Sequence, residues 1–166
     1  MKILLTGGGT GGHFYPVIAV AEELNQIAEE RKLVQIELFY MASRPYDERL
    51  LFENNLQFVK VPAGKMRRYF SILNFLDIFK TAIGVIKAVW RIFLMYPDVV
   101  FGKGGYDSFP AILAAKIFRI PVVIHESDTQ PGKVNAWAGK FARRVAVTFI
   151  EAAEKFPKKE VIAHTG

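Results

Sequence analysis

The stretch KILLTGGGTGGH, residues 2–13, joins a short apolar run to a loop in which five of six positions are glycine. The run Lys2–Thr6 has the length and composition of a buried strand. A helix is predicted over Phe14–Glu30, with Pro16 tolerated in its first turn. A strand, a glycine-rich turn and a helix in this order predict the first unit of a parallel α/β sheet.

Strands and helices continue to alternate along the chain. Further strands are predicted over residues 33–41, 57–61, 98–101, 121–125, 144–149 and 161–163. Further helices are predicted over residues 46–54, 71–94, 110–118 and 133–141, with a short one after residue 149. This alternation predicts a Rossmann-like, doubly wound parallel sheet that is covered by helices on both faces and joined by right-handed crossovers.

Length and composition indicate one globular domain. The chain has 166 residues, of which 51% are hydrophobic and 23% charged, so a disordered chain is excluded. It contains no cysteine, which excludes disulfides, thiol catalysis and cysteine zinc sites, and suits a reducing cytoplasm. The N-terminus lacks the long apolar region of a signal peptide.

The net charge of +6 is concentrated in one segment. Residues 60–104 hold eight basic side chains and two acidic ones, and the rest of the chain is balanced. A local basic region indicates an anionic partner, namely a membrane surface, a pyrophosphate or a nucleic acid. An ordinary solvated face is the alternative.

Three unusual loops each follow a predicted strand. They are the first glycine loop, the segment GKGGYDS at residues 102–108 and the segment HESDTQPG at residues 125–132. In a parallel sheet such loops share one edge, and ligands bind beyond the carboxyl ends of the strands. We therefore expect the three loops to form one composite site.

The first loop fits more than one kind of ligand site. Gly7, Gly9 and Gly12 satisfy the dinucleotide pattern G-x-G-x-x-G, but the second strand ends without the acid that would hold a ribose. Arg44 would suit a 2′-phosphate, so an NADP-type site stays open, whereas a P-loop is excluded because no Gly-Lys-Ser/Thr follows. A neutral His13 at the start of the helix is a candidate general base.

The other two loops carry polar side chains. Tyr106 and Ser108 can hydrogen-bond a sugar or phosphate, although Ser108 could instead cap the next helix. His125, Glu126 and Asp128 cluster at a strand end without a familiar metal-ligand spacing. Hydrogen bonding to a polyhydroxyl ligand is the better interpretation.

The predicted helix over residues 71–94 has two apolar stripes at spacings of three and four. The first is Ile72, Leu76, Phe79, Ile83, Ile86, Trp90 and Phe93; the second is Phe75, Ile78, Ala82, Val85, Val89 and Ile92. One stripe suffices to cover a sheet, so we expect the second, which is flanked by basic residues, to stay partly exposed. Recurrent charges argue against a transmembrane helix and leave an interfacial membrane contact or a partner domain.

Four segments together resemble the N-terminal domain of the MurG-like peptidoglycan glycosyltransferases, family 28. They are GGGTGGHFYP (7–16), PAGKMRRYF (62–70), GKGGYDSFPAILAA (102–115) and IPVVIHESDTQPGKVN (120–135). Asp107 departs from the family pattern, because a small apolar residue is usual at this position.

The resemblance implies one half of a GT-B fold, over residues 1–166. Such enzymes move N-acetylglucosamine from UDP-N-acetylglucosamine to lipid I, with inversion, and so form lipid II. They work as peripheral proteins at the cytoplasmic face of the membrane. No metal, other cofactor or nucleic-acid partner is implied. The family continues into a C-terminal, donor-binding domain beyond the HTG at which this sequence stops, so the chain is expected to be inactive alone.

The resemblance also implies roles for individual residues. His13 would be the catalytic base. Donor contacts would come from Thr10, Gly11, Gly12 and Asp128, and acceptor contacts from Gly104, Gly105, Tyr106, Ser108, Glu126 and Asn135. The membrane contact would involve Phe75, Ile78, Val85, Lys80, Lys87 and Arg91. Two other functions stay open: a membrane-recruiting subunit of a split glycosyltransferase, similar to Alg14, and an NADP-binding module.

Overall fold

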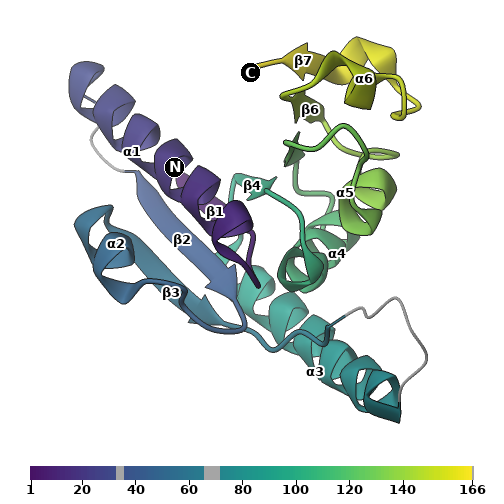
Figure 1. Cartoon of the computed structure of the whole chain (residues 1–166). Coiled ribbons are helices and arrows are strands. Elements are labelled where there is room, and N and C mark those ends of the chain that lie inside the picture. Colours follow the sequence, from purple (N-terminus) through teal and green to yellow (C-terminus); the bar gives the residue numbers. More distant parts are fainter. Residues whose placement is uncertain (33–35, 66–71, 166) are drawn as a thin grey trace.

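The computed structural model describes residues 1–32, 36–65 and 72–165, and their strands form one seven-stranded sheet. The strand order is β3-β2-β1-β4-β5-β6-β7, and every neighbouring pair is parallel (Figure 1). The strands are β1 (Lys2–Thr6), β2 (Glu37–Ala42), β3 (Leu56–Lys60), β4 (Val99–Gly102), β5 (Val122–Glu126), β6 (Arg144–Val147) and β7 (Ile162–His164). The predicted doubly wound parallel sheet is confirmed.

Helices cover the sheet through two separate cores. The α-helices are α1 (Gly11–Glu30), α2 (Glu48–Glu53), α3 (Ile72–Met95), α4 (Phe109–Ile117), α5 (Lys133–Ala138) and α6 (Ile150–Ala153). Short 3₁₀ turns are η1 (Tyr106–Ser108) and η2 (Lys159–Val161). One core joins alternate residues of β1 and β2 to α1 and α2, and the other joins the opposite strand face to α3, α4 and α5.

The order of the strands in the sheet changes direction at the neighbouring strands β1 and β4. From β1 it winds outward through β2 to β3, and β4 then returns to pair with the other side of β1. In doubly wound sheets this switch point opens a crevice at the carboxyl ends of the strands. The loops that follow β1 and β4 therefore flank the crevice.

The first helix differs from the prediction at its start. It begins at Gly11 rather than Phe14, so His13 lies within its first turn and Pro16 lies deeper inside the helix. Glycine has a low helix propensity, which favours a later start. Burial of Phe14 and Val17 against the sheet outweighs that preference. Residues 33–35, which the prediction included in the second strand, lie outside the described residues.

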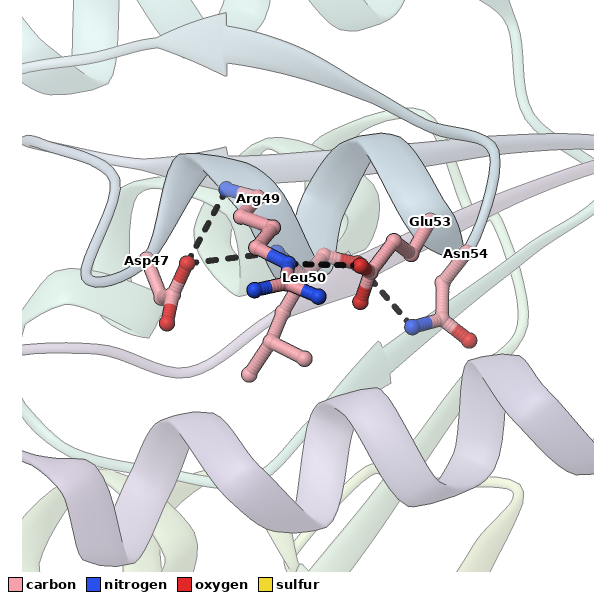
Figure 2. A network of polar contacts seen from close by, with 5 residues as sticks. All are labelled: Asp47, Arg49, Leu50, Glu53 and Asn54. Atoms are coloured by element: carbon pink, nitrogen blue, oxygen red, sulfur yellow. Dashed lines mark hydrogen bonds and ion pairs between the residues drawn. The ribbon is translucent and has the colours of Figure 1, made fainter.

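The short helix α2 is stabilised by its own side chains (Figure 2). The Asp47 carboxylate caps it by accepting the backbone N–H groups of Arg49 at 2.9 Å and Leu50 at 3.2 Å. Arg49 and Glu53 form an ion pair at 2.7 Å, one helical turn apart. The Asp47 cap satisfies two backbone donors at the helix start. Burial of Leu51, together with the hydrogen bond that the Asn25 amide donates to the Asn54 carbonyl at 2.9 Å, places α2 on the face that α1 covers.

The prediction that the first apolar stripe of α3 packs on the sheet is wrong. Its members from Leu76 to Phe93 are exposed, and the buried positions are Gly84, Ala88 and Ile92. A Cβ atom at Gly84 would collide with the carbonyl oxygen of Pro62, so α3 approaches the chain after β3 backbone to backbone. The small residues thus select the buried face. The side chain of Ile72 lies outside the described residues.

The outward side of α3 is an extended apolar surface, here called the α3 apolar face. It comprises the exposed side chains of Phe75, Leu76, Ile78, Phe79, Ile83, Ile86, Trp90 and Phe93. Lys80, Lys87 and Arg91 are also exposed on this helix. Within the described residues, no helix has both the length and the apolar character required to span a bilayer.

Candidate functional site

The three loops that follow β1, β4 and β5 meet at the carboxyl edge of the sheet. Gly9 lies against the Tyr106 ring, which joins the first loop to the second. The Lys103 ammonium donates a hydrogen bond to Ser127 Oγ at 2.8 Å, which joins the second loop to the third. The prediction that the loops form one composite arrangement is confirmed.

Gly105 packs closely against the first loop. Its φ is +80°, in the region that favours glycine. A Cβ atom there would lie 2.8 Å from the carbonyl oxygen of Gly8 and 3.4 Å from the ring of His13. A side chain at this position would push the two loops apart and would contact the His13 imidazole.

His13 is a half-buried imidazole on the first turn of α1. Its Nδ1 lies 2.8 Å from Thr10 Oγ1, so the threonine hydroxyl orients the ring. Burial lowers the pKa of His13 below 6.5, and the positive charge of Lys103 lowers it further. The negative charges of Glu126, Asp128 and Asp107 act in the opposite direction. The ring is therefore predominantly neutral at pH 7 and can accept a proton.

Glu126 and Asn135 hold the third loop in shape. The Glu126 carboxylate accepts the backbone N–H groups of Asp128 at 3.1 Å and Gly132 at 3.0 Å. It also accepts the Asn135 side-chain amide at 3.0 Å, and that amide donates to the His125 carbonyl at 3.0 Å. Both side chains are buried, so their observed contacts organise the loop from beneath.

The other predicted site residues divide by exposure. Thr10, Gly12 and Asp128 are exposed, and Gly11, Gly105 and Tyr106 are partly buried, so all six are at least partly accessible to solvent. Gly104 and Ser108 are buried. The Ser108 hydroxyl donates to the Gly105 carbonyl at 2.8 Å and makes no cap hydrogen bond, so the alternative of a side-chain cap on α4 is wrong.

A cavity of about 850 Å³ opens beside the composite loops, between α3 and α5. Its lining is mostly apolar and includes Ile78, Val85, Ile86, Phe109 and Trp137. Tyr106 connects it to the loops, and its charged lining residues are Lys65, Lys133 and Asp77. An elongated ligand with an apolar part and an anionic part fits such a surface. Arg67 and Arg68 of the basic segment lie outside the described residues.

Asp107 places a carboxyl group beneath the first glycine loop. The residue is 2% exposed, and its Oδ2 accepts the Ser43 hydroxyl at 2.9 Å. Its Oδ1 is buried and has no hydrogen-bond partner among the described residues. Burial raises the pKa of Asp107 above its ordinary value, although the Ser43 hydroxyl, Arg44 and Lys80 partly oppose the shift. The ionised carboxylate is thus destabilising where it stands.

We expect Asp107→Asn to raise the free energy of unfolding at pH 7 by about 1 kcal/mol, because it removes a poorly solvated charge and keeps an acceptor for Ser43. The folded-state pKa lies above the unfolded one, so the wild-type penalty is complete above the folded-state pKa. It vanishes as the pH falls to the unfolded-state pKa. Urea unfolding across this range should show the two proteins converge at low pH. Glu151→Gln, at an exposed position, is the control; a less stable Asp107→Asn at pH 7 would contradict the prediction.

Sequence reasoning missed two members of this arrangement. In the sequence, Lys103 stands out only as part of the basic segment, and Ser127 carries no signal of its own. The signal for Lys103 was its position, since a charged residue directly after a buried strand and before two glycines must lie at the loop junction. In residues 1–32, 36–65 and 72–165, no three His, Asp or Glu side chains form a group that could hold a metal ion.

Comparison with known proteins identifies the family. A family model described as the glycosyltransferase family 28 N-terminal domain matches residues 3–147. The chain belongs to glycosyltransferase family 28. The matched residues of this family 28 domain include all three loops of the composite arrangement.

Three curated relatives of the family 28 domain share the name UDP-N-acetylglucosamine--N-acetylmuramyl-(pentapeptide) pyrophosphoryl-undecaprenol N-acetylglucosamine transferase. The Treponema denticola protein is 41% identical over 93% of the chain and 40% of its own length. The Borreliella afzelii protein is 37% identical over 99% of the chain and 44% of its own length. A Bacillus cereus protein, which has this name with the suffix 2, is 38% identical over 99% of the chain and 45% of its own length. The chain thus spans less than half the length of these relatives.

Solved structures agree with the fold. Acinetobacter baumannii MurG superimposes with a TM-score of 0.71 at 27% identity, over 99% of the chain and 45% of MurG. The S. aureus MnaA–UDP structure gives a TM-score of 0.70 at 19% identity, over 100% of the chain and 44% of MnaA. At this identity the likeness shows the fold alone. The family 28 domain therefore has the architecture of one half of a GT-B fold.

Proposed function

We propose that the chain is the acceptor-binding half of an inverting glycosyltransferase that moves N-acetylglucosamine from UDP-N-acetylglucosamine to lipid I and forms lipid II. The observation that carries this proposal is the match, at 37–41% identity over 93–99% of the chain, to relatives whose names specify that donor and acceptor. The sugar and pyrophosphate of lipid I would lie at the composite loops. Its lipid side would lie toward the apolar cavity beside α3.

The proposed chemistry begins at His13. Its Nε2 would take the proton of the 4-hydroxyl group of the muramoyl sugar. The freed oxygen attacks C1 of N-acetylglucosamine while the bond from C1 to the UDP oxygen breaks, and UDP leaves with the electron pair. Attack from the side opposite the leaving group inverts the anomeric centre. The proton on His13 then returns to solvent.

Thr10 would select the productive tautomer of His13. Nε2 can accept a proton only when the hydrogen of the neutral ring sits on Nδ1. That N–H can donate to Thr10 Oγ1, which lies 2.8 Å away. The exposed Thr10, Gly12 and Asp128 would face the donor sugar across the crevice.

The remaining proposed contacts concern the acceptor and the membrane. Backbone N–H groups of the glycine loops and of the first turn of α1 favour negative groups such as a pyrophosphate. The α3 apolar face, with Lys80, Lys87 and Arg91 beside it, would rest on the cytoplasmic face of the membrane as a peripheral contact. This placement would bring the cavity next to the lipid that carries the acceptor.

A chimaera tests the proposed function. Residues 1–166 would replace the matching N-terminal part of the Treponema denticola relative, and transfer of labelled N-acetylglucosamine to a soluble lipid I analogue would be measured. We expect lipid II analogue to form with the new linkage inverted. Hydrolysis of the donor without transfer, or binding of vesicles without binding of the acceptor by the chain, would contradict the proposal. The second outcome would favour the membrane-recruiting alternative.

A further inference from the structure

Lys103 occupies a central position that the proposed chemistry leaves without a role. It directly follows β4 and is only 3% exposed, which is rare for a lysine. Its backbone N–H donates to the Thr6 carbonyl at 2.8 Å, at the end of β1. Its carbonyl accepts the Asn135 side-chain amide at 3.5 Å, from α5. The backbone of Lys103 is therefore fixed between two of the elements that form the site.

The Lys103 ammonium reaches into the third loop. It donates to Ser127 Oγ at 2.8 Å, between the two acidic residues of that loop. Burial lowers the pKa of Lys103, whereas the charges of Glu126 and Asp128 raise it. Among the residues that the structure describes, neither carboxylate forms an ion pair with it. The ammonium thus acts on its surroundings through one hydrogen bond and through its charge.

We propose that Lys103 is a positioning residue of the transfer site: its ammonium anchors the turn that carries Asp128 and supplies positive charge to the surroundings of His13. The inference rests on the proposed function for its link to catalysis. Its structural and electrostatic parts concern this chain alone.

The anchoring part follows from the hydrogen bonds of the turn. Asp128 is exposed, and its backbone N–H donates to Glu126 Oε1 at 3.1 Å. Ser127, which precedes it, is held from below by the Lys103 ammonium. Without that donor the Ser127 hydroxyl loses a charge-assisted bond, and the hydrogen bonds of Glu126 and Asn135 remain to hold the turn.

The electrostatic part follows from the charges around His13. Lys103 and His13 both pack against Gly7, where a Cβ atom would lie 2.7 Å from Lys103 Cβ and 3.0 Å from the His13 carbonyl oxygen. The charge of Lys103 lowers the pKa of His13, and the charges of Glu126, Asp128 and Asp107 raise it. Without this cation, burial is the remaining effect that opposes the three carboxylates, so the imidazolium form becomes more favourable and the pKa of His13 rises. Lys103 also lowers the pKa of His125, which would rise for the same reason. A larger fraction of His13 would then be protonated at pH 7 and unable to act as a base.

Nuclear magnetic resonance of the chain itself tests the electrostatic part. The imidazole signals of His13, His125 and His164 would be followed against pH in wild type, Lys103→Met and Lys103→Arg. We expect Lys103→Met to shift the titrations of His13 and His125 to higher pH and Lys103→Arg to leave them close to wild type. His164, on the edge strand β7, is the internal reference.

Two outcomes would overturn the electrostatic part. One is a His13 titration in Lys103→Met that coincides with wild type. The other is an equal shift in Lys103→Met and Lys103→Arg, because arginine keeps the charge and the shift would then reflect packing. Melting temperatures of both variants would show that the folded state is the species being titrated.

Ser127→Ala separates anchoring from charge. It removes the acceptor of the Lys103 hydrogen bond and keeps the ammonium, so the His13 titration should stay unchanged. Hydrogen exchange at the Asp128 amide should become faster in both Ser127→Ala and Lys103→Met. Unchanged exchange in both variants would overturn the anchoring part.

The chimaera separates this inference from the proposed function. Because His13 must be neutral to act, Lys103→Met should move the acidic limb of kcat/KM to higher pH, and Lys103→Arg should restore it. If the acidic limb of the kcat/KM profile is unchanged in Lys103→Met while the His13 titration shifts to higher pH, the proposed link between Lys103 and catalysis is overturned. If the wild-type chimaera transfers no sugar, the proposed function fails, and the titration and exchange results still decide the role of Lys103 within the chain.

Discussion

Replacing His13 with alanine should lower the kcat of the chimaera by about 100- to 10,000-fold, the range that a positioned general base contributes. The acceptor KM should change little, because the loop N–H groups and the apolar cavity remain. Initial rates with varied lipid I analogue at saturating donor would separate the two parameters. An unchanged kcat would remove His13 as the base.

A second histidine offers a matched control for this experiment. His125 is also partly buried, and its Nε2 lies 3.2 Å from Thr148 Oγ1. Thr148 follows β6, which pairs with the edge of β5 opposite to β4. His125→Ala should reduce kcat far less than His13→Ala. Thr10→Val should fall between the two, because it removes the partner of Nδ1 and keeps Nε2.

The pH dependence of the same reaction shows in which direction the pKa of His13 is shifted. Burial, followed by the charge of Lys103, lowers the pKa of His13 below 6.5. Since the neutral ring is the active form, activity should persist below pH 6.5 and fall only as the pH drops through that lowered pKa. The residual activity of His13→Ala should lack this limb.

The sheet and its loops could be predicted because their signals are local. Short apolar runs separated by glycine-rich or helical segments specify strand, loop and crossover in turn. Parallel pairing then brings all three loops to one edge, whatever the details of the turns. Element ends shifted by a few residues, most clearly at Gly11, where packing of Phe14 against the sheet outweighed the low helix propensity of glycine.

The buried face of α3 could not be predicted from its apolar pattern. Both stripes are apolar, so hydrophobicity does not separate inside from outside. The face is decided by close approach at Gly84, which depends on the path of the chain near Pro62. Helix packing depends on where small residues allow contact as well as on apolar area.

The network beneath the site was also invisible in the sequence. Lys103 and Ser127 are 24 positions apart and meet because β4 and β5 are neighbours in the sheet. Asp107 was recognised as a departure from the family pattern, but its burial and its bond to Ser43 depend on how η1 packs against the loop after β2. Such contacts require the tertiary structure.

Charged substitutions on the α3 apolar face should have the second large effect. We expect Phe79→Glu combined with Trp90→Glu to weaken partitioning of the chain onto vesicles with anionic lipid on the order of 100-fold. Burying each large apolar side chain contributes about 1.5–3 kcal/mol, and the substitution removes that contribution and adds repulsion from the lipid. Sedimentation of the chain with vesicles over a range of lipid concentrations would measure the partition coefficient.

The choice of these two positions separates membrane contact from folding and from acceptor binding. Phe79 is 55% and Trp90 62% exposed, so the free energy of unfolding should stay within about 0.5 kcal/mol of wild type. Neither residue lines the apolar cavity, so binding of a soluble lipid I analogue should be preserved. The control is Phe52→Glu with Ile150→Glu, at exposed positions on α2 and α6 with the same change in charge. Equal partitioning of the two double variants would mean that the α3 apolar face meets a protein partner instead of the lipid surface.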